Sequence, residues 1–346
     1  MKKKILYIST NDGSDMRINK EIKTLSKKAD IYFLGVGTYG DKNYAKSFCK
    51  EFILVEEKRN SLKAIIKQIK IFLKITKSIK FNSIHIINEQ LMIFFYPWLF
   101  RHHVVLDIFD SIFMKKNQPG NKLSLIKKLV YKPINYVFVT DKNRFNMMPD
   151  FIKSKLGILE NFPNHYGGET KKDTQFLTIF YNGTMTNERG TKFLQDLLDF
   201  DNRIKVIMAG WANDENTSEF SNCDYVDFRG IITQKEATKI AATESDYIMC
   251  CYEPSNQNNI NASPNKIYDA FQTRTPVIIN KEVKVSSFVR DNNIGVVLNS
   301  FYDYDIKSIS KELFLKKDNF NFSYENAITY SWEKIEGKLL KAHRII

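Results

Sequence analysis

Short apolar runs recur along the first half of the chain, and longer segments in which apolar positions repeat at helical spacing lie between them. The runs predict strands at 4–9, 30–34, 52–56, 83–88, 104–109 and 136–140. The intervening segments predict helices near 15–28, 58–80, 91–100, 123–131 and 143–148. Because strands alternate with helices, the pattern predicts a parallel sheet that helices cover on both faces.

A polar stretch at 160–173, with Pro163 and two adjacent glycines, is typical of a linker. After it the same pattern begins again. Strands are predicted at 176–182, 204–209, 225–228, 246–251, 276–279 and 295–298. The first two of these runs lead into Gly183 and Gly210, where we expect the strands to end.

Helices are predicted between most of these strands, for example at 192–200, and a last helix at 324–341 has one apolar face. We therefore expect an α/β protein with two Rossmann-like, doubly wound domains, 1–165 and 174–322. A C-terminal helix within 323–346 is expected to pack across their junction. In such domains ligands bind at the carboxyl ends of the strands.

Charge is distributed unevenly along the chain. Residues 1–172 hold 32 of the 52 Lys and Arg residues and 15 of the 39 acids, a net charge of +17, whereas the remainder carries −4. Five lysines of the predicted helix at 58–80 step by three and four residues, which places them on one face beside an apolar stripe. A second basic stretch, 115–132, also lacks acids. Such faces suit an anionic membrane surface, although a core-packed helix with a solvated lysine face has the same pattern.

Composition argues against several other classes of protein. No uninterrupted apolar window of about 18 residues occurs, and the first residues run directly into a predicted strand, so neither a membrane span nor a secretion signal is expected. The four cysteines and five histidines lack metal-site or disulfide spacing, so we expect reduced thiols and no metal. The acidic triplets at 199–201 and 303–305 fit solvated turns. The glycine pattern at 35–40 follows the second strand rather than the first, which argues against nicotinamide or flavin binding.

The segment at 261–280 carries the strongest chemical pattern. Ser263 and Asn265 are suited to cap a helix that starts here, and Pro264 fits its first turn, so free backbone amides and Lys266 would face an anion. One turn further along, Asp269 is placed to accept hydrogen bonds from ribose hydroxyls. A capped helix with an exposed lysine would give the same pattern, so both interpretations stay open.

The segment at 181–190 is a second candidate. Gly183 permits close approach of a ligand to the backbone, and Arg189 precedes a helix that begins at Gly190. Arginine pairs with phosphate in a forked geometry that lysine lacks. A surface arginine in a turn is the alternative.

The run SPNKIYDAF followed by TPVII resembles the donor-binding signature of retaining GT-B glycosyltransferases, especially the large fourth family that includes bacterial capsule and lipopolysaccharide enzymes. Other pieces resemble that family in the same order along the chain: DMRINKEIKTLSKKADIYFLG, VVLDIFDS, ILENFPN, YNGTMTNERGTKFL and VDFRGIITQKEATKIAATESDYIM. The resemblance covers most of the chain and is strongest over 181–280.

The resemblance implies that Lys266 and Arg189 hold the donor diphosphate and act in catalysis, and that Asp269 binds the donor ribose. Backbone near Gly230 and Ile231 would receive the base. The complete donor site expected here is Gly183, Thr184, Arg189, Gly230, Ile231, Ser263, Pro264, Asn265, Lys266 and Asp269.

Three side chains of the first domain, at predicted junctions between strands and helices, are candidates for acceptor or sugar contacts: Asp15, Arg17 and Asp110. Asp110 is also a candidate catalytic residue. A helix cap or a surface ion pair is an equally compatible role for each of them.

The chain departs from the family's pattern at three places. The first of two glutamates spaced eight apart falls on Asn261, and the second on Asp269. A glycine usual before the Pro-Val pair is Arg274, so we expect that turn to be built differently. Phe109 stands where the family often has histidine.

We therefore expect a metal-independent glycosyltransferase that moves a sugar, with retention, from a nucleotide-sugar donor to a lipid-linked or surface-polysaccharide acceptor. Two cations and a helix N-terminus stabilise a departing diphosphate without a cofactor. The expected location is the cytoplasm, peripherally at the inner face of the plasma membrane. One alternative is a nucleotide-sugar epimerase of GT-B-like fold. The other is a non-catalytic basic binding protein, although no nucleic-acid-binding module is recognisable and nucleic acid is not an expected partner.

Overall fold

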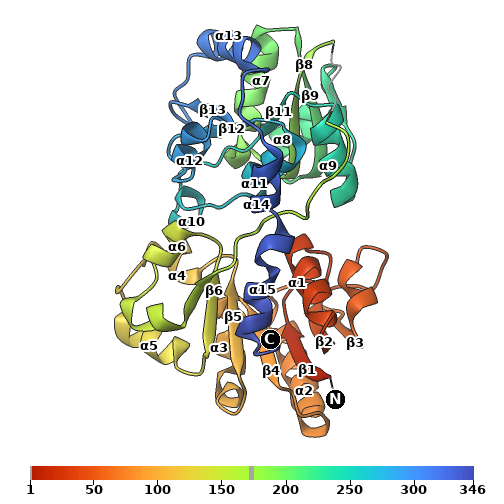
Figure 1. Ribbon diagram of the computed structural model, residues 1–346, viewed down its shortest axis with the longest axis vertical. Coiled ribbons are helices and arrows are strands. Elements are labelled where there is room, and N and C mark those ends of the chain that lie inside the picture. Colours follow the sequence, from red (N-terminus) through yellow and green to blue (C-terminus); the bar gives the residue numbers. More distant parts are fainter. Residues whose placement is uncertain (1, 171–174) are drawn as a thin grey trace. The chain divides into compact units, whose positions relative to one another are not determined.

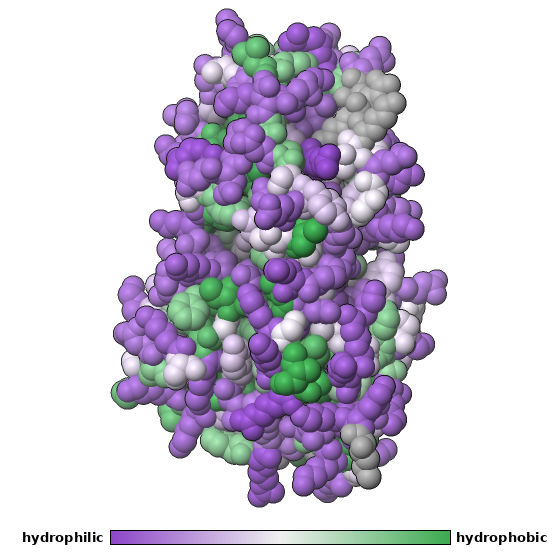
Figure 2. Space-filling view, viewed as in Figure 1, coloured by the Kyte–Doolittle hydropathy of each residue, from purple (hydrophilic) through white to green (hydrophobic). Residues whose placement is uncertain are grey.

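The computed structural model describes residues 2–170 and 175–346, which form two compact units (Figure 1). Unit 1 contains residues up to Glu160 together with Ile335–Ile346, and unit 2 contains Asn161–Lys334. Each unit is built around one sheet whose neighbouring strands pair in parallel. In Figure 2 hydrophilic side chains cover most of the face drawn, in keeping with apolar cores inside each unit.

The sheet of unit 1 has the order β3-β2-β1-β4-β5-β6-β7. Its strands are β1 Lys3–Ile8, β2 Ala29–Val36, β3 Glu51–Val55, β4 Ser83–Ile87, β5 Val104–Ile108, β6 Tyr136–Val139 and β7 Leu156–Ile158. Its helices are α1 Met16–Ser26, α2 Leu62–Ser78, α3 Glu89–Leu99, α4 Ile112–Lys115, α5 Ser124–Tyr131 and α6 Lys142–Asn146, with short 3-10 turns η1 Tyr44–Phe48 and η2 Asp150–Lys155. The sequence pattern identified the strands except β7, which has only three residues.

Alternation along the strands of unit 1 divides its core between two faces. Leu6 and Ile8 of β1 pack in an apolar cluster with residues of α2, α3 and α5. Tyr7, between them, points to the opposite face, where its hydroxyl donates a 2.6 Å hydrogen bond to Glu21 of α1. Helices therefore cover both faces, as a parallel sheet requires.

The sheet of unit 2 has the order β10-β9-β8-β11-β12-β13. Its strands are β8 Leu177–Met185, β9 Ile204–Ala212, β10 Val226–Phe228, β11 Tyr247–Met249, β12 Val277–Asn280 and β13 Gly295–Leu298. Its helices are α7 Thr191–Phe200, α8 Glu215–Phe220, α9 Gln234–Thr243, α10 Gln257–Ile260, α11 Asn265–Thr273, α12 Ser286–Asp291, α13 Ile306–Lys316 and α14 Tyr324–Thr329, with the 3-10 turn η3 Asn187–Arg189.

The expected strand ends at Gly183 and Gly210 are wrong, because β8 and β9 both continue past their glycines. The two glycines are partners in the ladder. A Cβ on Gly210 would lie 2.1 Å from the Gly183 carbonyl oxygen, and the φ angles of Gly183 and Gly210 are +87° and +133°. The glycines therefore allow two strands to approach closely in an unusual conformation, rather than ending them.

The last helix is also different from its prediction, because it is divided into α14 and α15, Trp332–Ala342. The Trp332 amide donates a 2.7 Å hydrogen bond to the Pro163 carbonyl. That amide is thereby withdrawn from a continuous helical ladder. Residues of α15 from Ile335 onward belong to unit 1.

Buried polar contacts hold α15 in unit 1. The Nδ1 atom of His343 lies 2.7 Å from the Ser83 hydroxyl, and its Nε2 atom lies 3.0 Å from Nδ1 of His85. Burial, and then the neighbouring His103, lower the pKa of His343 to about 3. A neutral imidazole can both donate and accept a hydrogen bond, so this histidine connects the C-terminal segment to β4.

Candidate functional site

The candidate donor site lies at the carboxyl edge of the unit 2 sheet. All of its strands run in parallel, so the segments that follow β8, β10 and β11 start from this one edge. The backbone amide of Gly210 donates a 2.8 Å hydrogen bond to the Gly230 carbonyl, which joins the ends of β9 and β10. The predicted positions Gly183 and Gly230 are thus connected through neighbouring strands.

The turn between β8 and α7 is held by the buried Tyr181 side chain. Its hydroxyl accepts a hydrogen bond from the Thr186 amide and donates one to the Thr186 carbonyl, each at 2.9 Å. Gly190 closes the turn with φ +98°, and a Cβ there would lie 2.2 Å from the Met249 methyl group. The position of Arg189, just before Gly190, is therefore fixed by the core beneath it.

Arg189 lies over an aromatic ring, with its guanidinium carbon 3.8 Å from the centre of the Tyr252 ring. Its Nη1 atom is buried and has no hydrogen-bond partner among residues 2–170 and 175–346. No carboxylate of the described residues lies within 4 Å of this side chain. The ring contact orients the guanidinium, and its Nη1 donor is left without an acceptor among the described residues.

Helix α11 starts at Asn265, and its N-cap position is Pro264, with no side-chain cap. The prediction that Ser263 or Asn265 caps this helix is therefore wrong. Proline at the N-cap has no side-chain acceptor, and the Ser263 hydroxyl is buried without a partner in the described part of the chain. The first turn of α11 thus keeps amides that no side chain satisfies, which is the arrangement that binds anions.

Lys266 lies in this first turn, partly buried. Burial lowers the pKa of its ammonium group, and the nearby Arg189 lowers it further, whereas Cys250 and Asp269 act in the opposite direction. No carboxylate among the described residues forms an ion pair with Lys266. Two cations therefore share one site with no paired counter-charge, which is unfavourable until an anion binds.

Asp269 lies one turn further along α11. Together with Asn182 of β8 and Thr238 of α9 it lines a small hollow. The Asn182 Oδ1 atom is buried and has no partner within the described residues. A carboxylate and an amide oxygen at one hollow form an acceptor pair suited to hydroxyl groups.

The other predicted donor residues lie on the same edge with open space beside them. Gly183 and Gly230 have nothing within 4 Å of where a Cβ would be, and Gly230 has φ +61°. Thr184 and Ile231 are exposed. Backbone at these two glycines is therefore open to close approach of a ligand.

The turn after α11 is made by Arg274, and how it compares with the turn of the resembled family stays a prediction. Arg274 itself adopts the left-handed conformation, with φ +54°, that glycine favours at the end of a helix. Such a conformation costs a residue with a side chain about 1–2 kcal/mol. The Thr275 hydroxyl, buried beside it, donates a 2.6 Å hydrogen bond to the Ala241 carbonyl and fixes the turn.

Sequence reasoning missed Tyr181, Asn182 and Tyr252 as members of the site. Asn182 and Tyr181 lie inside the segment that drew attention to Gly183, so their position beside that glycine was a usable signal. Tyr252 comes three residues after the end of β11. Nothing in its local sequence indicates that its ring contacts Arg189, which lies in the turn between β8 and α7. The buried thiols nearby are inert, since burial raises the pKa of Cys250 to about 12.

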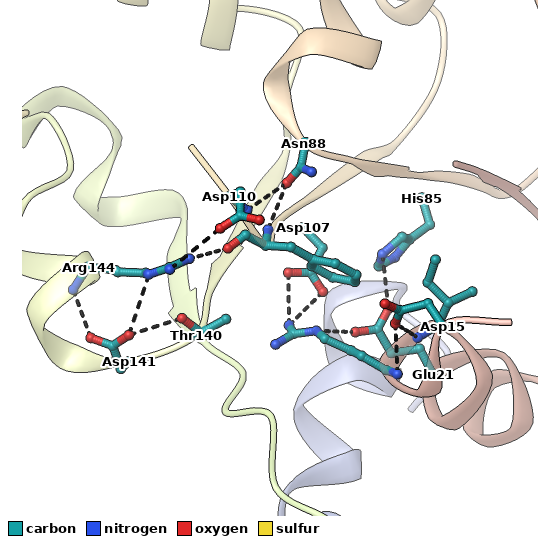
Figure 3. Close-up of polar contacts among 12 residues, drawn as sticks. Asp15, Glu21, His85, Asn88, Asp107, Asp110, Thr140, Asp141 and Arg144 are labelled. Atoms are coloured by element: carbon teal, nitrogen blue, oxygen red, sulfur yellow. Dashed lines mark hydrogen bonds and ion pairs between the residues drawn. The ribbon is translucent and has the colours of Figure 1, made fainter. Parts of the chain in front are cut away.

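The predicted acceptor residues of unit 1 are involved in local contacts (Figure 3). The Asp15 carboxylate caps α1 by accepting hydrogen bonds from the amides of Arg17 and Ile18. The Arg17 side chain is buried, with Nε 2.8 Å from Glu21 and Nη2 2.7 Å from Asp107. Both side chains therefore stabilise the local structure of unit 1. Their contact with an acceptor stays a prediction.

Asp110 differs from these two because its side chain is 73% exposed. Its backbone amide donates a 3.0 Å hydrogen bond to Asn88, and the buried Arg144 lies 3.8 Å from its carboxylate while donating to the Phe109 carbonyl (Figure 3). Asp110 is thus a carboxylate presented to solvent at the carboxyl edge of the unit 1 sheet.

One buried group of the described residues has the ligand types for a metal ion, namely Glu21, His85 and Asp107. Arg17 already pairs with both carboxylates. Burial, and then the charge of Asp107, raise the pKa of Glu21. The Arg17 guanidinium therefore supplies the positive charge beside these two carboxylates. The acidic triplets also have local duties, because Asp201 pairs with Arg203 and Asp305 caps α13.

Within the described residues, none of the helices combines the length and the apolar character that crossing a bilayer would need. No family model matches the sequence, and no curated protein matches it either.

Solved structures match the chain over nearly its whole length. Sucrose-phosphate synthase from Thermosynechococcus elongatus has a TM-score of 0.71 and 11% identity, covering 99% of this chain and 98% of that one. Anabaena Alr3699/HepE in complex with UDP-glucose has a TM-score of 0.69 and 11% identity, covering 99% and 100%. A putative UDP-N-acetylglucosamine 2-epimerase from Listeria monocytogenes has a TM-score of 0.59 and 7% identity, covering 100% and 95%. These similarities, with two parallel sheets each covered by helices, identify the GT-B fold.

Proposed function

We propose that this chain is a glycosyltransferase that transfers a sugar from a nucleotide-sugar donor, with retention of configuration and without a metal, to a lipid-linked or surface-polysaccharide acceptor. The observation that carries the proposal is that two cations, Lys266 and Arg189, lie together at the start of α11, which has no side-chain cap. Neither has a carboxylate partner among the described residues. A diphosphate supplies the negative charge that this site lacks. HepE, of the same fold, has been solved with UDP-glucose.

In this proposal each group at the carboxyl edge of the unit 2 sheet contacts one part of the donor. Lys266, Arg189 and the first amides of α11 hold the diphosphate. The Asp269 carboxylate accepts hydrogen bonds from the ribose hydroxyls, next to the unpartnered oxygen of Asn182. The base lies along the backbone near Gly230 and Ile231, where no side chain blocks approach to the glycine.

Catalysis then rests on the leaving group. As the glycosidic bond to the diphosphate breaks, charge grows on a phosphate oxygen, and the two cations and the helix start stabilise it more in the transition state than in the ground state. The acceptor hydroxyl attacks from the face that the diphosphate leaves, and its proton passes to a phosphate oxygen. Asp110, exposed on unit 1, is the proposed contact on the sugar or acceptor side.

The test begins with nucleotides. A thermal-shift panel of UDP, GDP, ADP and CMP identifies the base, and calorimetry then measures the affinity of the best nucleoside diphosphate. Asp269→Asn should weaken that nucleotide but leave inorganic pyrophosphate unchanged, because pyrophosphate has no ribose. Asp318→Asn, at an exposed position of unit 2, is the matched control. Equal losses for nucleotide and pyrophosphate would remove the ribose role from Asp269.

A nucleotide-sugar epimerase is the second candidate, because proteins of that activity share the fold. Mass spectrometry of the donor with and without an acceptor lipid separates the two. A transferase forms a glycosylated lipid and releases nucleoside diphosphate only when the acceptor is present. Conversion of the donor without any acceptor would favour the epimerase. The proposed place of action is the inner face of the plasma membrane, where a lipid-linked acceptor is reached.

A further inference from the structure

Helices α2, α3 and α5 form one layer over a single face of the unit 1 sheet. Figure 1 labels the three helices, and α3 contacts both α2 and α5. Buried side chains of all three belong to the same apolar cluster. The outer side of this layer, called the α2–α3–α5 face below, is turned away from the sheet.

Helix α5 turns its apolar side chains outward. Leu125 is 78% exposed and Leu129 is 62% exposed, whereas the exposure of Lys127 is only 1%. The Lys127 ammonium donates hydrogen bonds of 2.7 Å to the carbonyls of Gln118 and Gly120. These contacts fix the rotation of the helix, so the exposed leucines are a property of the fold and not of a loosely held segment.

Tyr131 also holds α5 in this orientation. Its hydroxyl donates a 2.9 Å hydrogen bond to the buried Glu89 carboxylate of α3. Rotating α5 to bury its leucines would break these bonds and expose Lys127's partners, at a cost of about 1–3 kcal/mol for each buried polar group left unsatisfied. The outward apolar side is therefore stable in water and available for a partner.

Large apolar side chains are exposed on the other two helices and their ends as well. The complete exposed set on this layer is Leu62, Ile66, Ile93, Phe94, Phe100, Leu123, Leu125, Ile126 and Leu129. Single exposed apolar residues are ordinary on protein surfaces, but such a gathering on one layer marks an interaction site.

Most of the charge on the same layer has one sign. Glu57, before the start of α2, pairs with Lys63 and Lys67. Between residues 58 and 140 the acids are Glu89, Asp107 and Asp110, and the first two are buried. Asp110 lies after β5, outside the three helices. The exposed lysines on or beside the layer are Lys63, Lys67, Lys70, Lys74, Lys77, Lys122, Lys128 and Lys132.

We propose that the α2–α3–α5 face docks on an anionic phospholipid bilayer, with Leu125, Ile126 and Leu129 of α5 inserted among the acyl chains and the lysines placed against the headgroups. Apolar side chains surrounded by cations are complementary to such a surface, which offers hydrocarbon beneath a layer of negative charge. A soluble acidic partner would satisfy the lysines but would have to supply its own apolar patch. The inference extends the proposed lipid-linked acceptor but does not depend on it.

The experiment is flotation of the full chain with vesicles of phosphatidylcholine alone and of phosphatidylcholine with about one-third phosphatidylglycerol. The native protein should float with the anionic vesicles and be released by high salt. The double variant Leu125→Ser/Leu129→Ser should lose at least about tenfold in partition coefficient, since each buried methylene contributes to insertion. Lys128→Glu/Lys132→Glu should lose binding to the anionic vesicles only.

Leu315→Ser is the matched control, because Leu315 is 64% exposed on α13 of unit 2. It should bind vesicles as the native protein does. Unchanged flotation of both double variants would overturn the proposal. A second result would also overturn it: the native protein does not bind vesicles but forms dimers, and Leu125→Ser/Leu129→Ser dissociates them. The α2–α3–α5 face would then bind a second copy of this chain. Nucleotide affinity, measured in parallel, should be unchanged in every variant, so failure here is distinct from failure of the proposed transferase.

Discussion

Lys266→Met tests the donor site with two results of opposite sign. The substitution keeps the length and apolar stem of the side chain but removes a charge that burial and Arg189 both disfavour. We therefore expect weaker nucleotide binding together with a more stable free protein. Few substitutions of a partly buried lysine predict both.

The magnitudes follow from the surroundings of the ammonium group. A charge-assisted hydrogen bond contributes about 1.5–3 kcal/mol, so nucleoside diphosphate affinity should fall about 10- to 150-fold. A group left without a partner in a partly buried site costs about 1 kcal/mol, and its removal should raise the melting temperature by about 2–4 °C.

The pH dependence has a definite sign. The pKa of Lys266 in the folded protein is lowered from the ordinary value of 10.5, which the unfolded chain keeps. Between the folded and the unfolded pKa, the unfolded state therefore binds more protons than the folded state. The stability of the native protein should therefore rise through that window. The advantage of the methionine variant is expected to be largest at neutral pH and to shrink toward pH 10.5.

Calorimetric titration with the best nucleoside diphosphate measures the first effect, and differential scanning calorimetry of the free protein measures the second. Lys311→Met, at an exposed position of α13, is the control and should change neither. A Lys266→Met protein that binds nucleotide with native affinity would refute the assignment of this lysine. If it lost affinity but was less stable without ligand, the argument from an unpaired charge would fail.

Four further predictions concern other residues. Arg189→Lys should weaken nucleoside diphosphate binding about tenfold in calorimetry, because lysine lacks the guanidinium fork. Gly190→Ala should lower the free energy of unfolding in urea by about 1–3 kcal/mol, since its Cβ would meet the Met249 methyl group in a left-handed conformation. Arg17→Met should cost about 3–5 kcal/mol in the same assay, because two buried carboxylates lose their cation. The pKa of His343 is lowered to about 3, so stability should fall as pH drops below about 6.5, and His343→Gln should flatten that decline in urea titrations from pH 4 to 7.

Much of the fold follows from local pattern. The strands of both sheets, except β7, were expected within a few residues of where they lie, because buried parallel strands are continuous apolar runs between polar turns. The errors in the ends of β8 and β9 came from glycine. Local rules treat Gly183 and Gly210 as strand ends, but they are ladder partners whose missing side chains allow the two strands to meet.

The candidate donor segment was found in the sequence, but its capping was not predicted correctly. Ser263 and Asn265 are both good capping residues, and the position between them, Pro264, took the N-cap instead. The periodicity likewise did not predict that the leucines of α5 are exposed. A helical pattern shows that one side is apolar, but not whether that side meets the core or the solvent.

By itself the sequence determined the two doubly wound folds and the helix start that carries Lys266. These depend on periodicity and on residues close together in the chain. The predicted linker at 160–173 lies partly outside the described residues and stays a prediction. Only the tertiary structure decided which charges are paired. Arg17 finds Asp107 at a separation of 90 residues and becomes part of the interior, whereas Arg189 and Lys266 have no carboxylate partner within the described residues. The physical reason is that the energy of a charge depends on burial and on neighbours set by the fold, which no local pattern encodes.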